Sequence, residues 1–405
     1  MLIPNVGFGG AEKSFSKLSL LLAERHQVFV AVFNKDSYTA ASYAHGGTFI
    51  DLEIETGASL PKKAKAFWDR IRKIRALKKS KQIDVTISFL EGADYVNILA
   101  GGHDKKILSI RGSKTYDRNI AGAMGWLRKK VLIPQLYKKA DAIVSVNKGI
   151  SNELKHDFGI RGKVLFTEIF NYYDLAGMKK LSQQPLSASL SPLFNHPVLI
   201  SHGRLSHEKG FQYLLRVLAK VKQLNPEVRL VLVGEGPFHA TLTQMCTDLN
   251  LSFGSEIKAG VVPDVFFAGF QPNPLQWLSK AAVFALSSFT EGFPNGLAEA
   301  MIAGVPVVAS DCPWGPRDIL QGRNYGEEFY TLTRPEFTPQ GVLLPMLDQA
   351  GAEEAWAHVL VQLLSDAALR TGMSAAAAQR MQAFSYQNIA GQWYDLIDTL
   401  TGNHQ

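Results

Sequence analysis

Residues 281–311 read AAVFALSSFTEGFPNGLAEAMIAGVPVVASD and contain a strand, a turn, a helix and a second strand by their pattern. The apolar runs Ala282–Leu286 and Val305–Ala309 are typical of buried strands. Between them, a turn with Gly and Pro leads into a helical pattern, and the acids Glu291 and Glu299 lie eight residues apart. One acid therefore falls on the turn and the other about one turn into the helix. Backbone N–H groups at such a helix start can face an anion or sugar hydroxyls.

The rest of the sequence alternates short apolar runs with helical patterns in the same way. In the first half the predicted strands are Leu2–Val6, Val28–Phe33, Thr48–Leu52, Val85–Phe89, Lys106–Ile110, Ala142–Val146 and Val164–Ile169. In the second half they are Val198–His202, Val228–Val233 and Val265–Ala268, followed by the two runs above. The helical patterns between them include Ala11–Glu24, Gly210–Gln223 and Pro237–Leu249. This alternation predicts an α/β fold with parallel sheets and right-handed crossovers.

One segment breaks the alternation and marks a domain boundary. Residues 172–196 are rich in Ser, Gln and Pro, a composition that is typical of linkers. We therefore expect two α/β domains of similar size, over residues 1–171 and 197–383. The last segment, 384–405, is helical and aromatic, and we expect it to pack back on the first domain.

Composition and charge limit the classes of protein that the sequence can encode. Of its 405 residues, 46% are apolar and 20% charged, which suits two or three globular domains. The sequence has no run of about 18 apolar residues and no signal segment, so we expect a cytoplasmic protein. Its two cysteines, Cys246 and Cys312, are expected to be free thiols. A net charge of +7 suits nucleic acid, an acidic membrane or a phosphorylated substrate.

Several catalytic signatures are missing from the sequence. It contains no D-x-D, HxH or HExxH motif and no Cys-rich spacing, so we expect no metal site. It also lacks G-x-S-x-G and P-loop motifs, which argues against hydrolase and kinase chemistry. If a substrate carries a diphosphate, cations of the protein must offset its charge.

A glycine loop follows the first predicted strand and opens a helix. Gly9, Gly10 and Glu12 lie in this loop, where glycines let the backbone approach a ligand closely. The third glycine of a dinucleotide fingerprint is absent, and no acid closes the second strand. A loop facing a phosphate or sugar, a plain tight turn, and a nicotinamide or flavin site all stay open, the last being the poorest match.

Two cations follow the first strand of the second domain. Arg204 and Lys209 lie in a glycine turn at a carboxyl strand end, where parallel sheets bind ligands. An Arg fork and a Lys ammonium together suit a diphosphate, although plain surface charges would give the same pattern. Gly234 and Gly236 form a similar turn after the next strand, and such a turn alone is more often structural.

Residues Leu60–Lys81 have the spacing of a cationic amphipathic helix. Ten bases oppose one acid, and apolar residues recur at helical intervals. The segment is either an ordinary helix with a solvated basic face or a docking surface for an anionic membrane. For the second case, the bases expected to contribute are Lys62, Lys63, Arg72, Lys73, Lys78 and Lys79. A second basic and apolar segment, residues 126–139, lies in the same domain.

Taken together and in this order, the motifs resemble those of the retaining glycosyltransferases called family 4. The glycine loop at Gly7–Glu12 and the turn from Arg204 to Gly210 are similar to the family's N-terminal loop and diphosphate-binding turn. Glu291 to Glu299 is similar to its E-x7-E signature. Residues 310–320 are most similar to members that build surface or lipid-linked oligosaccharides. The resemblance covers nearly the whole chain. It implies the GT-B fold, in which two Rossmann-like domains, one for the acceptor and one for a nucleotide-sugar donor, face each other across a cleft.

The resemblance also implies roles for single residues. Glu299 would bind the nucleotide ribose and Glu291 the hydroxyls of the donor sugar. Arg204 and Lys209 would hold the diphosphate and stabilise the charge that develops on it as the sugar–phosphate bond breaks. Further donor contacts would come from Phe293, Pro294, Asn295, Gly296, Leu297, Gly234 and Gly236. The acceptor or its phosphate would face Gly9, Gly10, Glu12 and Arg111.

The sequence departs from the family pattern at three places. The first predicted strand is short, because Met1 directly precedes Leu2–Asn5. Many members carry a His after the strand that here runs to Ile110, and this chain has Arg111 nearby instead. We therefore expect Arg111 to contact an anionic acceptor and do not expect a histidine-assisted step. Residues Asn324–Gln340 read as an insertion before Gly341–Pro345.

The sequence therefore predicts a cytoplasmic, metal-independent, retaining glycosyltransferase with a UDP-linked donor and no other cofactor. Its acceptor would be a glycan or lipid-linked sugar, with peripheral contact to the inner membrane face. A nucleotide-sugar epimerase would share the GT-B fold but would need no acceptor. A sugar phosphorylase would share it too but would need inorganic phosphate. A non-catalytic nucleic-acid- or glycan-binding protein would explain the charge but not the paired glutamates. The complete set of Arg204, Lys209, Glu291 and Glu299 opposes a catalytically inactive homologue.

Overall fold

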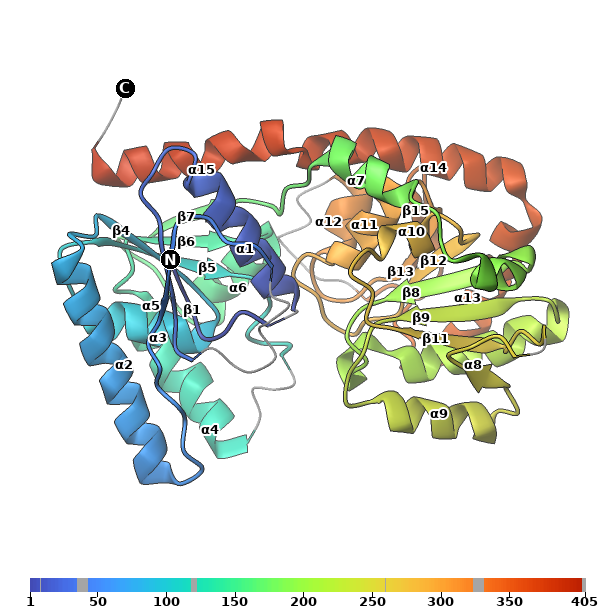
Figure 1. Cartoon of the computed structure of the whole chain (residues 1–405), viewed down its shortest axis with the longest axis horizontal. Helices are drawn as coiled ribbons and strands as arrows, with labels where there is room; N and C mark the ends of the chain where they lie inside the picture. Colours follow the sequence, from blue (N-terminus) through green and yellow to red (C-terminus); the bar gives the residue numbers. More distant parts are fainter. Residues whose placement is uncertain (8, 35–42, 118–121, 259, 323–330, 403–405) are drawn as a thin grey trace. The chain divides into compact units, whose positions relative to one another are not determined.

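The computed structural model of the chain describes residues 1–7, 9–34, 43–117, 122–258, 260–322 and 331–402. The chain divides into two compact units (Figure 1). The first unit contains Met1–Asn171 together with Ile389–Gln405, and the second contains Tyr172–Asn388. Each unit is built around its own β-sheet.

The first unit has a seven-stranded sheet in which the described pairs are all parallel, in the order β3-β2-β1-β4-β5-β6-β7. The strands are β1 (Leu2–Ile3), β2 (Phe29–Val32), β3 (Thr48–Asp51), β4 (Val85–Phe89), β5 (Lys105–Ile110), β6 (Ala142–Ser145) and β7 (Leu165–Glu168). The helices are α1 (Gly10–Leu22), α2 (Leu60–Ser80), α3 (Glu91–Ala100), α4 (Gly122–Leu127), α5 (Ile133–Tyr137) and α6 (Lys148–His156), with a π-helical turn over Arg128–Leu132. The last part of α15 (Tyr386–Thr401) also belongs here, because the Tyr394 hydroxyl donates to the Leu21 carbonyl at 2.7 Å.

The second unit has an eight-stranded sheet in the order β10-β11-β9-β8-β12-β13-β15-β14. Its strands are β8 (Val198–His202), β9 (Arg229–Val233), β10 (Phe253–Gly254), β11 (Val265–Gly269), β12 (Val283–Leu286), β13 (Val307–Ser310), β14 (Glu336–Thr338) and β15 (Gly341–Leu344). Only the edge strand β14 pairs antiparallel among the described strands of this sheet. The main helices are α7 (Leu175–Ser182), α8 (Phe211–Leu224), α9 (His239–Asp248), α10 (Leu275–Leu278), α11 (Asn295–Ala303), α12 (Pro316–Gln321), α13 (Ala352–Ser365) and α14 (Ala367–Met381).

The predicted α/β fold with parallel sheets is confirmed, because each predicted strand run overlaps a strand of the structure. Apart from strands such as β3 and β7, which are partly exposed, these strands are mostly buried on both faces, which explains why they read as continuous apolar runs. The sequence prediction missed β10, β14 and β15. Two of these are only two or three residues long, too short for a periodic signal.

One segment differs from its prediction, and a second is described only in part. Residues 172–196, expected to form a linker, belong to the second unit and form α7 and a 3-10 helix over Ala188–Asn195. The Asp174 side chain caps α7 by accepting from the Gly177 N–H at 2.9 Å, and α7 packs against α10 and α11. Of the expected insertion Asn324–Gln340, residues 324–330 lie outside the described part, and the remainder contains β14.

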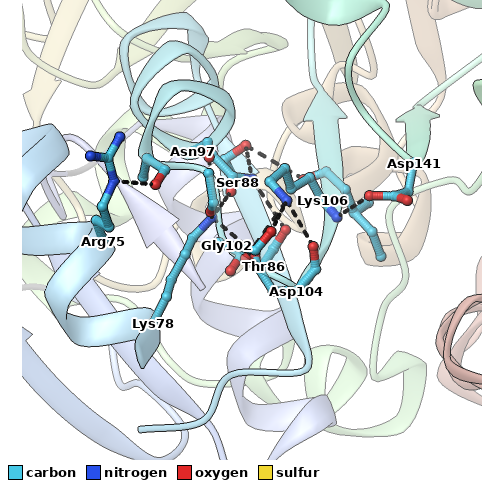
Figure 2. Close-up of polar contacts among 12 residues, drawn as sticks. Arg75, Lys78, Thr86, Ser88, Asn97, Gly102, Asp104, Lys106 and Asp141 are labelled. Atoms are coloured by element: carbon cyan, nitrogen blue, oxygen red, sulfur yellow. Dashed lines mark hydrogen bonds and ion pairs between the residues drawn. The ribbon is translucent and has the colours of Figure 1, made fainter. Parts of the chain in front are cut away.

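A buried polar network ties α2 and α3 to the sheet of the first unit (Figure 2). Lys78 of α2 is 6% exposed, donates to Oδ1 of Asn97 at 2.8 Å and forms an ion pair with Asp104 at 2.9 Å. The amide of Asn97 in turn donates to the Thr86 carbonyl and to Oγ of Ser88, both at 3.2 Å. Burial lowers the pKa of Lys78, and the contacts with Asp104 oppose that shift only in part. The network links both helices to β4.

A buried acid lies next to this network, at the start of α3. Asp94 has no exposed surface and accepts from Oγ of Ser88 at 2.7 Å and from the Tyr137 hydroxyl at 2.8 Å. Burial raises its pKa to about 7, although the nearby Lys114 and the two hydrogen bonds act in the opposite direction. At pH values between 3.8 and about 7, the folded protein therefore keeps a proton on Asp94 that the unfolded chain has lost.

This proton predicts a pH dependence of stability. Between the unfolded pKa of 3.8 and the folded value near 7, the folded state binds more protons, so stability falls as pH rises. Asp94→Asn keeps the site neutral and should remove this loss. From pH 5 to 8 the wild type should lose about 2 kcal/mol relative to the variant in urea unfolding. The exposed Asp395→Asn serves as control, and parallel pH curves for wild type and Asp94→Asn would contradict the prediction.

Candidate active site

The carboxyl ends of β8 and β12 lie side by side in the sheet of the second unit. The strand that follows each of them in the sequence lies on its outer side: β9 lies beside β8, and β13 lies beside β12. In open parallel sheets such a reversal leaves a crevice outside the strand ends, where ligands bind. The turn after β8 carries Arg204 and Lys209, and the turn after β12 carries Glu291. Topology therefore brings two predicted cations and one predicted glutamate to the same edge.

An ion pair joins these two turns. Nζ of Lys209 lies 2.7 Å from Oε1 of Glu291, and Oγ of Ser288 donates to the same oxygen at 2.6 Å. Burial lowers the pKa of Lys209, but the attraction of Glu291 and their hydrogen bond outweigh it, so the pKa lies above its ordinary value. Lys209 is thus a cation that is already oriented by its neighbours.

Close backbone packing makes this ion pair possible. Gly210 has φ +69°, and a Cβ atom there would lie 2.0 Å from the carbonyl oxygen of Ser287. Oγ of Ser287 also donates to the Lys209 carbonyl at 2.8 Å. The two turns can approach this closely only because residue 210 has no side chain.

The glycines after β9 have the same steric purpose. A Cβ at Gly234 would lie 2.0 Å from the Gly203 carbonyl oxygen, and one at Gly236 would lie 2.3 Å from that of Leu205. The Leu205 N–H donates to the Glu235 carbonyl at 2.9 Å. Gly234 and Gly236 therefore support the turn that carries Arg204, and their predicted contact with a donor stays a prediction.

Arg204 differs from Lys209 in its surroundings. The residue is exposed, and its guanidinium has no hydrogen-bond or ion-pair partner among the residues that the structure describes. An Arg in this state can offer its full planar fork to an anionic group.

Glu299 lies on the first turns of α11 and is 1% exposed. Its Oε2 is 3.3 Å from Nδ1 of His202, the last residue of β8. Gly296 allows this approach, because a Cβ there would already touch the His202 carbonyl oxygen at 3.0 Å. The second glutamate therefore faces the end of β8, next to the turn that carries Arg204.

The turn between the two glutamates has its side chains packed into the protein. Phe293 and Leu297 are 6% and 0% exposed, and Oδ1 of Asn295 accepts from the Tyr173 hydroxyl at 2.6 Å. Pro294 lies against the turn at Gly315, where a Cβ would be 2.7 Å from its Cδ. A ligand at this turn would meet backbone rather than these side chains.

A charged cluster supports the Gly315 turn from behind. Arg317 forms a bidentate ion pair with Asp311, at 3.0 and 2.6 Å, and a further bond to Glu336 at 2.9 Å. Oδ2 of Asp318 accepts from the Gly315 N–H at 3.1 Å, and burial raises the pKa of this acid to about 6. These contacts fix the loop after β13 against the turn at Pro294.

The remaining predicted residues lie in the first unit. Gly9 precedes α1, and the Glu12 carboxylate folds over it so closely that a Cβ there would clash at 2.0 Å. Arg111 follows β5, donates to Oδ1 of Asn171 at 3.0 Å and stacks on the ring of Phe89 at 4.6 Å. Gly10 opens α1 next to Glu12. Part of Arg111's donor capacity is therefore used inside the protein.

Three residues in the second unit were missed by the sequence analysis: His202, Ser288 and Tyr173. His202 and Ser288 could have been suspected, because one ends a strand at the switch point and the other lies three residues before Glu291. Tyr173 gave no signal, because its partner Asn295 is 122 residues away in the sequence.

Comparison with known proteins identifies the class. Residues 196–366, most of the second unit, match the family Glycosyl transferases group 1. An N-acetylgalactosaminyltransferase of Campylobacter jejuni, whose name gives a diphospho-undecaprenol-linked acceptor, is 26% identical over 96% of both chains. An uncharacterized glycosyltransferase of Methanocaldococcus jannaschii is 27% identical over 65% of this chain, and the match spans 64% of that protein's length.

Solved structures show the same fold. Sucrose-phosphate synthase from Thermosynechococcus elongatus superposes with a TM-score of 0.75 at 19% identity, covering 100% of this chain and 99% of that one. HepE from Anabaena, solved in complex with UDP, gives 0.72 at 19% identity and 98% coverage of both chains. The chain has the GT-B fold, and it is a glycosyltransferase in which residues 196–366 match the group 1 family.

The residues that the structure describes contain no group of three or more His, Cys, Asp or Glu side chains that could hold a metal ion. Among their helices, none is both long and apolar enough to span a bilayer.

The contact between Gly210 and Ser287 predicts that the site tolerates no side chain at residue 210. Gly210→Ala would create a clash and a strained positive φ, so it should destabilise the protein by about 2 kcal/mol or more in urea unfolding. Gly372→Ala is the matched control, since a Cβ there meets nothing within 4 Å and Ala favours a helix. Equal stability of the two variants would contradict this account of the turn.

Proposed function

We propose that the protein is a retaining glycosyltransferase that moves a sugar from a UDP-linked donor to a lipid-linked or glycan acceptor in cell-surface polysaccharide or oligosaccharide synthesis. The observation that carries the proposal is the ion pair of Lys209 and Glu291 at the switch point, with Glu299 buried nearby. Similarity to the Campylobacter transferase and to the UDP-bound HepE supports the choice of acceptor and nucleotide.

The chemistry explains why this arrangement suits sugar transfer. Breaking a sugar–phosphate bond places negative charge on the leaving diphosphate and positive charge on the sugar. Lys209 and the exposed Arg204 would stabilise the diphosphate, and cations that are oriented beforehand lower such a barrier by a few kcal/mol each. Glu291 would bind sugar hydroxyls and Glu299 the ribose. Attack of the acceptor from the side of the leaving group would retain configuration without a protein nucleophile.

The backbone of residues 292–297 would contribute the remaining donor contacts. The helix α11 begins after the turn that follows β12 and has no side-chain cap, so the N–H groups of its first turn would be donors at this edge of the sheet. A helix N-terminus favours electronegative atoms, such as the oxygens of a sugar phosphate.

Two substitutions test the site. Glu299→Gln should abolish the ribose contact and Lys209→Ala the diphosphate contact, so each should reduce transfer at least about a hundredfold. Activity is measured with UDP-glucose, UDP-N-acetylglucosamine and UDP-N-acetylgalactosamine and an undecaprenyl-diphosphate-linked sugar. Circular dichroism and thermal melting check that both variants stay folded. Wild-type activity of either variant with saturating donor would refute the assignment.

We further propose that the first unit contacts an anionic membrane. On α2, Leu60 and Trp68 are 77% and 61% exposed, and on α4 Met124 and Trp126 are 59% and 63% exposed. Such apolar side chains insert into the lipid interface when basic residues flank them. The expected basic set needs a correction: Lys78 is buried against Asp104, and Lys73 donates to the Leu52 carbonyl. The exposed bases of α2 that carry the proposal are Lys62, Lys63, Lys65, Arg72 and Lys79.

Vesicle co-sedimentation tests the membrane contact. Changing the five exposed bases of α2 to Gln should weaken binding to phosphatidylglycerol vesicles at low salt by more than tenfold, because each base near the surface contributes about 1 kcal/mol. The control changes five exposed cations of the second unit: Lys179, Lys180, Lys258, Lys280 and Arg334. Equal binding of the two variants would show that only net charge matters, which would contradict a contact through α2.

A further inference from the structure

The chain enters and leaves the second unit through two paired segments. Tyr173, the second residue of this unit, forms a parallel bridge with Ser385, near its last residue, Asn388. The Tyr173 N–H donates to the Phe384 carbonyl at 2.9 Å, and the Tyr386 N–H donates to the Tyr173 carbonyl at 3.0 Å. The two ends of the unit therefore hold each other in place.

The side chains of this bridge reach the turn between the two glutamates. Tyr173 is 0% exposed, and its hydroxyl donates to Oδ1 of Asn295 at 2.6 Å. Its ring stacks on Phe293 with a centroid distance of 6.4 Å and an interplanar angle of 29°. Phe384 packs against the same ring edge-to-face at 5.3 Å. Phe293 is thus enclosed between one residue from each end of the unit.

Asn295 is unusual in how it uses its amide. Asn is favoured as a helix N-cap, where its oxygen accepts from the backbone of the first turn. Here it is the first residue of α11, and its oxygen accepts from Tyr173 instead, while the helix has no side-chain cap. The arrangement leaves the N–H groups of the first turn to other partners. It also fixes the turn at two points, Phe293 and Asn295.

We propose that Tyr173 is a positioning residue for the sugar of the donor, acting through Asn295 and Phe293. The inference rests on the proposed function. The side chains of Phe293 and Asn295 both contact Tyr173, which fixes the backbone of the turn that follows Glu291. The nucleotide end of the donor, bound through Glu299, Arg204 and Lys209, does not depend on the contacts that Tyr173 makes with Phe293 and Asn295. Loss of these contacts should therefore weaken binding of the sugar and spare binding of the nucleotide.

Tyr173→Phe removes the hydroxyl and keeps the ring. Calorimetric titrations with UDP, UDP-glucose and UDP-N-acetylgalactosamine give the dissociation constant of each ligand. For the UDP-sugar that the wild type binds, the ratio of its Kd to that of UDP should rise about three- to tenfold, as expected for one neutral hydrogen bond. The KM for that donor should rise by a similar factor.

Three further proteins sharpen the test. Asn295→Ala should give the same change of ratio, and the double variant should be no worse than either single variant, because both remove one bond. Tyr213→Phe is the matched control: its hydroxyl has no hydrogen-bond partner among the described residues, and its ratio should not change. If Tyr173→Phe does not fold, Asn295→Ala carries the test, since it leaves Tyr173 intact.

The possible failures are distinguishable. An unchanged ratio, an equal loss of affinity for UDP and UDP-sugar, or additive effects in the double variant would overturn the role of Tyr173 alone. A wild-type protein that binds neither UDP nor any of the UDP-sugars would overturn the proposed function and this inference together.

Discussion

The close approach of the turns after β8 and β12 is the constraint on which the candidate site depends. Gly210 lies against the Ser287 carbonyl, and this contact sets the distance at which Lys209 meets Glu291. Without the adjacency of β8 and β12 in the sheet, the two residues, 82 apart in sequence, would not meet. The ion pair is thus a consequence of parallel topology combined with a glycine at one position.

The surrounding packing gives the site its rigidity. Gly234 and Gly236 let the loops after β8 and β9 stack backbone on backbone, and Arg317 and Asp318 fix the loop after β13 from behind. The side chains at 293 and 295 are anchored by Tyr173 and Phe384. Polar backbone groups and two cations then remain at the edge of the sheet. Such a preorganised set suits a ligand that carries both a diphosphate and a sugar.

Sequence reasoning predicted the elements well, because buried parallel strands have a strong apolar signal. Local motifs also singled out Arg204, Lys209 and the two glutamates; the structure brings Lys209 and Glu291 together, and the roles of all four stay predictions. Sequence reasoning could not predict which side chains turn inward. Lys78 reads as one more base of a basic helix, yet it is buried against Asp104 because α3 packs over it. Long-range partners such as Tyr173 and Asn295 leave no pattern in a single sequence.

The central claim is that the site at the carboxyl ends of β8 and β12 binds a nucleoside diphosphate. Titration calorimetry of UDP with the wild type and with Arg204→Ala tests it most directly, because Arg204 is exposed and its loss should not disturb the fold. The account predicts saturable binding by the wild type and at least about tenfold weaker binding by the variant, the loss expected for a charge-assisted contact. The absence of UDP binding by the wild type at millimolar concentration, or equal affinity of both proteins, would contradict it.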